Sequence, residues 1–198
     1  GAEAKHPLDL ERLGQYEALF GPDHWTLDRE GWRLMGLNAQ LLGTGTAREA
    51  QQYEWISEQL RGYRGRLGLF LHKPLFRNGP GEPEVHVRYV PMAPRRRLLD
   101  LLAGCDLRFV ASGHAHQTRR FVVDGVEHAW APSTAFLLPD SIQERIGEKV
   151  LGLLTLELTA TGHQFGLSTP ALEPNSLLDF AEIYPEVSTY AVRANGGT

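Results

Sequence analysis

Apolar residues along this chain recur with two periods, and these periods predict where helices and strands lie. Spacings of three and four residues run over residues 8–20, 47–63 and 94–103, and they predict helices because such positions share one helix face. Short apolar or alternating runs between turn residues predict strands. The predicted strands cover residues 25–28, 32–37, 67–71, 107–111, 119–123, 126–130, 152–159 and 165–168.

Residues at the ends of these segments support the same assignment. Thr46 is a candidate N-cap for the helix over residues 47–63, and Asp124-Gly125 is a hairpin signal between two of the strands. Helices and strands alternate in the first half of the chain, and hairpins dominate the second half. This order predicts a mixed α/β (α+β) sheet protein.

Two stretches lack a regular pattern. Residues 76–91 contain Asn78-Gly79-Pro80-Gly81-Glu82-Pro83, and we expect them to form an irregular loop of the kind that often carries function. Residues 175–198 are expected to form an irregular tail.

Composition and charge narrow the classes of partner. The chain has 198 residues, 42% of them hydrophobic, which fits one globular domain or a large part of one. The net charge of −4 gives no reason to expect nucleic acid or an anionic membrane as a partner. The basic run Arg95-Arg96-Arg97 opens a helical pattern, and we expect it to be solvated. No signal peptide or membrane span is visible, so a cytoplasmic location is expected.

The chain has one cysteine, Cys105, which excludes an intrachain disulfide and a cysteine-based zinc site. It lies between Gly104 and Asp106, in a predicted turn before a strand. We expect a buried or half-buried side chain without a chemical role.

Histidines follow two of the predicted buried strands. His72 comes directly after residues 67–71, and His114 and His116 follow residues 107–111. On an extended backbone His114 and His116 would share one face, and Gly113 is expected to adopt a conformation that a Cβ would resist. Neutral imidazole is a common ligand of divalent transition metals, so these positions predict a metal site.

The remaining histidines have simpler expectations. His128 lies on a predicted strand near Trp130, and we expect it in the core. We expect solvated positions in loops or turns for His6, His24, His86 and His163.

The order of these segments resembles the calcineurin-like metallophosphoesterase family. An apolar strand ending in His-x-Pro-Leu-Phe is followed by a loop, a helix and a strand ending in Gly-His-x-His. The likeness covers most of residues 21–158 and includes bacterial members similar to cyclic-nucleotide phosphodiesterases. Further segments that carry it are residues 32–38, 51–56 and 128–136.

The resemblance implies a fold and a chemistry. The fold would be the C-terminal half of a metallophosphoesterase-type β-sandwich flanked by helices. His72 and His114 would ligate one divalent ion and His116 a second, with Mn, Fe or Zn as candidates. Such a dinuclear centre would hydrolyse a small phosphomonoester or phosphodiester. The expected contacts to substrate are Lys73, Arg77 and Asn78.

The chain also departs from the family pattern. The upstream Asp-x-His, Gly-Asp-x-x-Asp and Gly-Asn-His motifs are absent: Asp23 and His24 are adjacent, and Asn38 is followed by Ala39. We therefore expect residues 1–198 to form a single partial domain, whose upstream half is a separate chain, a cleaved product or a missing segment. The catalytic residues that this half would supply are not identified.

Two alternatives stay open. The chain is either half of a phosphoesterase or a catalytically incomplete metal-binding or scaffold protein of the same fold. A weaker third possibility places His72, His114 and His116 on a single zinc ion with an open fourth position.

Overall fold

A computed structural model describes residues 8–83, 86–171 and 175–180. The chain divides into two compact units. The first unit comprises Gly1–His114 and Phe121–His128, and the second comprises Ala115–Arg120 and Ala129–Thr198. The expectation of one partial domain over residues 1–198 stays a prediction. Most of the expected tail, residues 181–198, lies outside the described residues.

The helices and strands confirm the predicted mixed α/β fold, with ends shifted by a few residues. The helices are α1 (Leu10–Phe20), α2 (Ala47–Leu60), α3 (Met92–Leu102) and the 3-10 turn η1 (Leu177–Phe180). The strands are β1 (Trp25–Arg29), β2 (Trp32–Leu37), β3 (Arg66–Leu71), β4 (Asp106–Ser112), β5 (Arg119–Val123), β6 (Val126–Trp130), β7 (Leu153–Leu158) and β8 (His163–Ser168).

The larger sheet has the strand order β1-β2-β3-β4-β6-β5. Strands β2, β3 and β4 are parallel because α2 and α3 each return the chain to the starting edge. Leu37 pairs with Leu71, and Leu71 pairs with Ser112. The residues that follow these three strands therefore meet at one carboxyl edge of the sheet, where open α/β sheets bind ligands.

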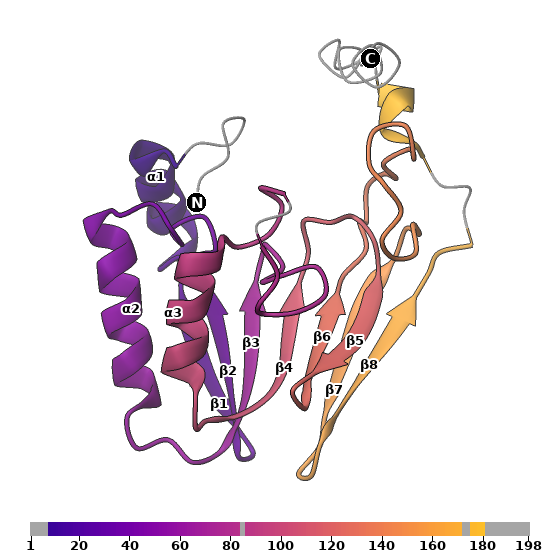
Figure 1. The fold of residues 1–198 in the computed structure, drawn as a ribbon. Coiled ribbons are helices and arrows are strands. Elements are labelled where there is room, and N and C mark those ends of the chain that lie inside the picture. Colours follow the sequence, from indigo (N-terminus) through magenta and orange to yellow (C-terminus); the bar gives the residue numbers. More distant parts are fainter. Residues whose placement is uncertain (1–7, 84–85, 172–174, 181–198) are drawn as a thin grey trace. The chain divides into compact units, whose positions relative to one another are not determined.

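One face of the parallel strands is covered by α2 and α3, which lie side by side in Figure 1. The helices bury apolar side chains at helical spacing against apolar side chains of the strands, which removes them from water. The helix residues are Tyr53, Ile56, Leu60, Leu98 and Leu102, and the strand residues are Met35, Leu37, Leu67, Leu69, Leu71 and Val110.

The N-terminus of α2 is capped as the sequence predicts. The Thr46 hydroxyl accepts a hydrogen bond from the Glu49 amide at 3.3 Å. The buried Glu49 carboxylate reaches back to the amides of Gly43 and Gly45 at 2.6 and 2.7 Å. The bond from Glu49 satisfies one of the amides that the first helical turn leaves without partners, and the bonds to Gly43 and Gly45 tie the preceding loop to the helix.

Arg95 differs from the expectation of a solvated basic run. Its side chain is 1% exposed, because α3 begins at Met92 and turns this residue toward the loop before it. The guanidinium donates to the carbonyl oxygens of Leu75 and Glu82, at 3.3 and 2.5 Å. Arg95 therefore anchors the loop that follows β3 to α3.

Aromatic rings cover glycines on the other face of the sheet. Phe109 pairs with Gly68 across β3 and β4, and Trp25 pairs with Gly36 across β1 and β2. A Cβ at Gly68 would lie 2.1 Å from the Phe109 ring, and one at Gly36 would lie 2.2 Å from the Trp25 indole. Phe70 packs edge-on against Phe109, with ring centroids 5.5 Å apart. Because Gly36 and Gly68 have no side chain, they leave the space that these rings fill.

The second unit contains the antiparallel pair β7 and β8, in which Leu153 pairs with Ser168 and Leu158 with His163. These two strands match the strands predicted over residues 152–159 and 165–168, with ends shifted by one or two residues. Within the described part of the chain, no helix is long and apolar enough to cross a membrane.

The contact between Gly68 and Phe109 predicts that one methyl group added at Gly68 will strongly lower the stability of the fold. Gly68→Ala must displace a ring that is fully buried, and such overpacking costs about 1–3 kcal/mol of unfolding free energy. Gly79→Ala is the matched control, because no atom lies within 4 Å of the added Cβ. Denaturant unfolding of both variants measures the difference, and equal midpoints would contradict the packing described.

Candidate functional site

His72 and His114 come together at the carboxyl edge of the sheet. His72 follows β3 and is exposed, and His114 lies two residues after β4 and is half-buried. The Gly113 amide donates a hydrogen bond to the His72 carbonyl at 3.0 Å, which extends the pairing of β3 and β4 beyond the strands. The His72 Nε2 and His114 Nδ1 atoms lie 3.0 Å apart. The ring centroids are 4.8 Å apart with the planes inclined by 69°.

The backbone at the histidine motif is not extended, so that expectation is wrong. His114 has φ 62° and His116 has φ 51°, both in the left-handed region that residues with a Cβ seldom adopt. Gly113 has no positive φ, and a Cβ there would have His72 Nδ1 as its nearest neighbour at 3.8 Å, an ordinary contact. The unusual conformation therefore falls on the histidines, because the chain leaves the strand at Ser112 and turns. Strain of this kind gathers at functional sites.

The facing nitrogens of His72 and His114 fit one edge of a metal coordination sphere. Two ligand nitrogens at ~2.0–2.1 Å from one ion, in adjacent positions, lie ~3 Å from each other. The observed separation is 3.0 Å. Without an ion, the same geometry suits one proton shared between two neutral imidazoles.

The remaining ligands of such an ion are not gathered in the described part of the chain. Over residues 8–83, 86–171 and 175–180, no group of three or more His, Cys, Asp or Glu side chains is placed to hold a metal ion. The histidine pair therefore fits part of a metal site, and assigning His72, His114 and His116 as a ligand set stays a prediction.

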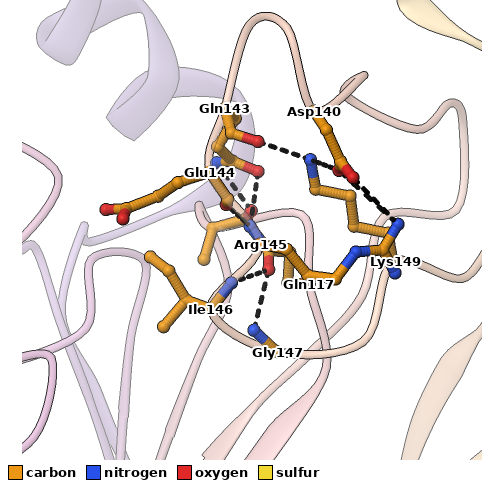
Figure 2. A network of polar contacts seen from close by, with 9 residues as sticks. Gln117, Asp140, Gln143, Glu144, Arg145, Ile146, Gly147 and Lys149 are labelled. Carbon is orange, nitrogen blue, oxygen red and sulfur yellow. Dashed lines mark hydrogen bonds and ion pairs between the residues drawn. The ribbon is translucent and has the colours of Figure 1, made fainter.

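His116 belongs to the second unit, where a polar network holds its segment (Figure 2). The Gln117 Oε1 atom accepts hydrogen bonds from the amides of Ile146 and Gly147 at 2.7 and 2.8 Å. Its Nε2 atom donates to Gln143 Oε1 at 2.7 Å. Because Gln117 is fully buried and uses both ends of its amide, it fixes the residue directly after His116.

The same loop holds the segment from its other side. Gln143 Nε2 donates to the Ala115 carbonyl at 2.9 Å. Lys149, whose side chain is 4% exposed, donates to the Gln143 carbonyl at 2.6 Å and to Asp140 at 2.8 Å. The backbone on both sides of His116 is therefore held by loop 140–149, and Figure 2 shows Gln117 beside the residues of this loop.

A polar cluster that the sequence pattern did not indicate forms near the start of β1 and the end of β2. Asn38 Nδ2 donates to Asp23 Oδ2 at 2.6 Å, and His24 Nδ1 lies 2.7 Å from Asp23 Oδ1. His24 also packs edge-on against Trp55 at 4.4 Å, so the expectation of a solvated His24 is wrong. Gln52 bonds both backbone polar groups of Asn38. Asn38 follows β2 as His72 follows β3, and this shared position was the available signal.

The three predicted substrate contacts lie at the start of the loop after β3. The Lys73 side chain is buried, with 1% of it exposed. The backbone amides of Arg77 and Asn78 both donate to the Glu82 carboxylate, which closes the loop on itself. Contact of Lys73, Arg77 and Asn78 with a substrate stays a prediction.

His128 lies in the core of the first unit, as predicted. It is 5% exposed, and its ring packs against Phe76 at 4.5 Å and stacks on Phe121 at 5.2 Å. Burial disfavours the charged imidazolium and lowers the pKa of His128 to about 4. The imidazole is therefore neutral at physiological pH.

Comparison with known proteins shows the fold and no family. No family model and no curated protein matches the sequence. Among solved structures, the chain is similar to GAP50, the anchor in the inner membrane complex of Plasmodium, with a TM-score of 0.54 and 12% identity over 74% of this chain and 49% of GAP50. A dimetal phosphatase from Danio rerio gives a TM-score of 0.43 and 13% identity over 61% of this chain and 56% of that protein.

These likenesses define a class of fold. The chain has the mixed α/β architecture shared with GAP50 over three quarters of its residues, and it spans about half the length of GAP50 and of the Danio rerio phosphatase. At this level of identity the comparison shows the fold alone.

The buried His128 predicts a loss of stability in acid. The folded pKa is about 4, and the unfolded pKa is near 6.5. Between these values the unfolded chain takes up a proton that the folded chain does not. The free energy of unfolding is therefore unaffected by protonation of His128 above pH 6.5. As the pH falls toward 4, this free energy decreases by up to about 3 kcal/mol.

Denaturant unfolding between pH 4 and pH 7 measures this loss. His128→Phe keeps a planar ring between Phe76 and Phe121 and removes the titrating group. We expect a shallower dependence of stability on pH in the variant than in the wild type. Identical slopes would contradict the neutral buried imidazole.

Proposed function

We propose that this chain supplies the histidine half of a metal-dependent phosphoesterase, which hydrolyses a small phosphomonoester or phosphodiester. The observation that carries the proposal is the facing pair His72 and His114, with 3.0 Å between Nε2 and Nδ1 at the carboxyl edge of β3 and β4. The order of the histidine motifs, which resembles the metallophosphoesterases, supports the same conclusion.

In this proposal the protein backbone sets the spacing of the two ligands. The hydrogen bond from the Gly113 amide to the His72 carbonyl ties the two motifs together directly beside the imidazoles. The left-handed backbone at His114 directs the chain away from the strand, and the exposed position of His72 leaves its ring open to solvent and substrate. A divalent ion bound there would neutralise phosphate charge and lower the pKa of a bound water.

The other predicted residues have roles that follow from their positions. We assign His116 to a second ion, with its backbone held by Gln117 and the loop 140–149. We assign Arg77 and Asn78, which open the loop after β3, to substrate contact, with buried Lys73 beside His72. The carboxylate ligands would come from an upstream half, as a separate chain or as part of a longer one.

One observation favours the alternative, a catalytically incomplete metal-binding or scaffold protein. In the described part of the chain, no third His, Cys, Asp or Glu joins His72 and His114 in a group that could hold an ion. An incomplete site of this kind would bind an ion weakly and would not activate water.

Metal titration of the 198-residue chain tests the histidine pair. We expect Mn²⁺ or Zn²⁺ to bind weakly, and His72→Ala or His114→Ala to lower the affinity by about tenfold or more because each removes one ligand. His86→Ala is the matched control, because His86 is an exposed loop histidine. Isothermal titration calorimetry measures the affinities, and equal binding in all variants would overturn the assignment.

Hydrolysis separates the two proposed functions. We expect the complete gene product to hydrolyse bis(p-nitrophenyl) phosphate with Mn²⁺, and His114→Ala to lower kcat by several orders of magnitude. Metal binding through the two histidines without hydrolysis by the complete product would favour the scaffold alternative.

A further inference from the structure

The first unit contains a cavity of about 420 Å³ that the proposed phosphoesterase chemistry does not use. It lies between the C-terminal end of α3, strand β4 and the hairpin of β5 and β6. Its volume is within the range of small-molecule pockets. The lining is mainly apolar and includes Phe76, Leu102, Leu107, Val110, Val126 and His128.

His128 is the polar group deep in this lining. His128 is 5% exposed, and the rings of Phe76 and Phe121 pack against its imidazole. Among the described residues, none makes a hydrogen bond to the His128 imidazole. Because the His128 imidazole lines the cavity, a suitable ligand group there can form a hydrogen bond with it in place of water.

The charges around the cavity define what can enter it. Burial keeps the His128 imidazole neutral, so it attracts no anion. Asp124, exposed in the hairpin turn, contributes a carboxylate to the lining. An anionic phosphoester would therefore be repelled, whereas an uncharged ring would bury apolar surface without losing charge solvation.

We propose that this cavity binds a small, uncharged aromatic molecule carrying one hydrogen-bonding group, which pairs with the His128 imidazole. The ring would occupy the space lined by Phe76, Leu102 and Val110, and its NH or OH group would reach His128. The proposal does not depend on the proposed phosphoesterase function.

Indole and 1-methylindole are suitable probes, because they share the ring system and only indole has an NH donor. Calorimetry with the wild-type chain is expected to show saturable binding of both, in the range of ~0.1–1 mM. His128→Phe should lower the affinity for indole about three- to tenfold, because one hydrogen bond is lost. The affinity for 1-methylindole should not change. His128→Gln, which keeps a hydrogen-bonding side chain, should restore part of the affinity for indole.

Cys105 reports occupancy without any mutation. It is the single cysteine of the chain, it lines the cavity, and burial raises the pKa of its thiol. Indole at saturating concentration is expected to slow alkylation of Cys105 by N-ethylmaleimide in proportion to the fraction bound.

Two substitutions of alanine by tryptophan test whether the probes bind in this cavity or elsewhere on the surface. Ala103→Trp places a large ring at the exposed rim of the cavity and should abolish binding of both probes. Ala93→Trp is the control, because Ala93 is exposed at the other end of α3 and does not line the cavity. The proposal is overturned if neither probe binds saturably to the wild-type chain, or if His128→Phe weakens both probes equally.

Discussion

The parallel pairing of β3 with β4 is the interaction on which the candidate site depends. Leu71 pairs with Ser112, and the ladder continues through the bond from the Gly113 amide to the His72 carbonyl. Because parallel strands end at the same edge, two histidines more than forty positions apart lie with ring nitrogens 3.0 Å from each other. A slip of the strands would separate the imidazoles and expose the apolar residues that face α2 and α3.

Past the strand ends, backbone conformation rather than side-chain alternation places the histidines. His114 and His116 both adopt left-handed φ values, which cost free energy for residues with a Cβ. Around His116 the surrounding structure offsets this cost, because the buried Gln117 bonds Ile146 and Gly147 while Gln143 bonds Ala115. A site that is strained locally and held by a satisfied polar network suits a role that needs fixed ligand positions.

The first unit combines two environments of opposite chemistry. The carboxyl edge holds the histidine pair, and Asp23 and Asn38 bond each other where β2 ends. The cavity behind α3 is apolar and buries a neutral imidazole. Burial explains the difference, because a partly exposed imidazole can exchange its proton for a cation, whereas His128 lacks the solvation that a charge requires.

The sequence by itself determined the helices, strands and turns of this protein. The periodicity of apolar residues, the Thr46 cap and the Asp124-Gly125 turn are local signals. They act through the backbone preferences of residues close together in the sequence. Only the tertiary structure decided that Arg95 is buried, that Asp23 meets Asn38, and that His114 carries the left-handed backbone. These features depend on partners distant along the chain, whose approach is set by helix packing and strand register, and no local pattern of residues encodes that approach.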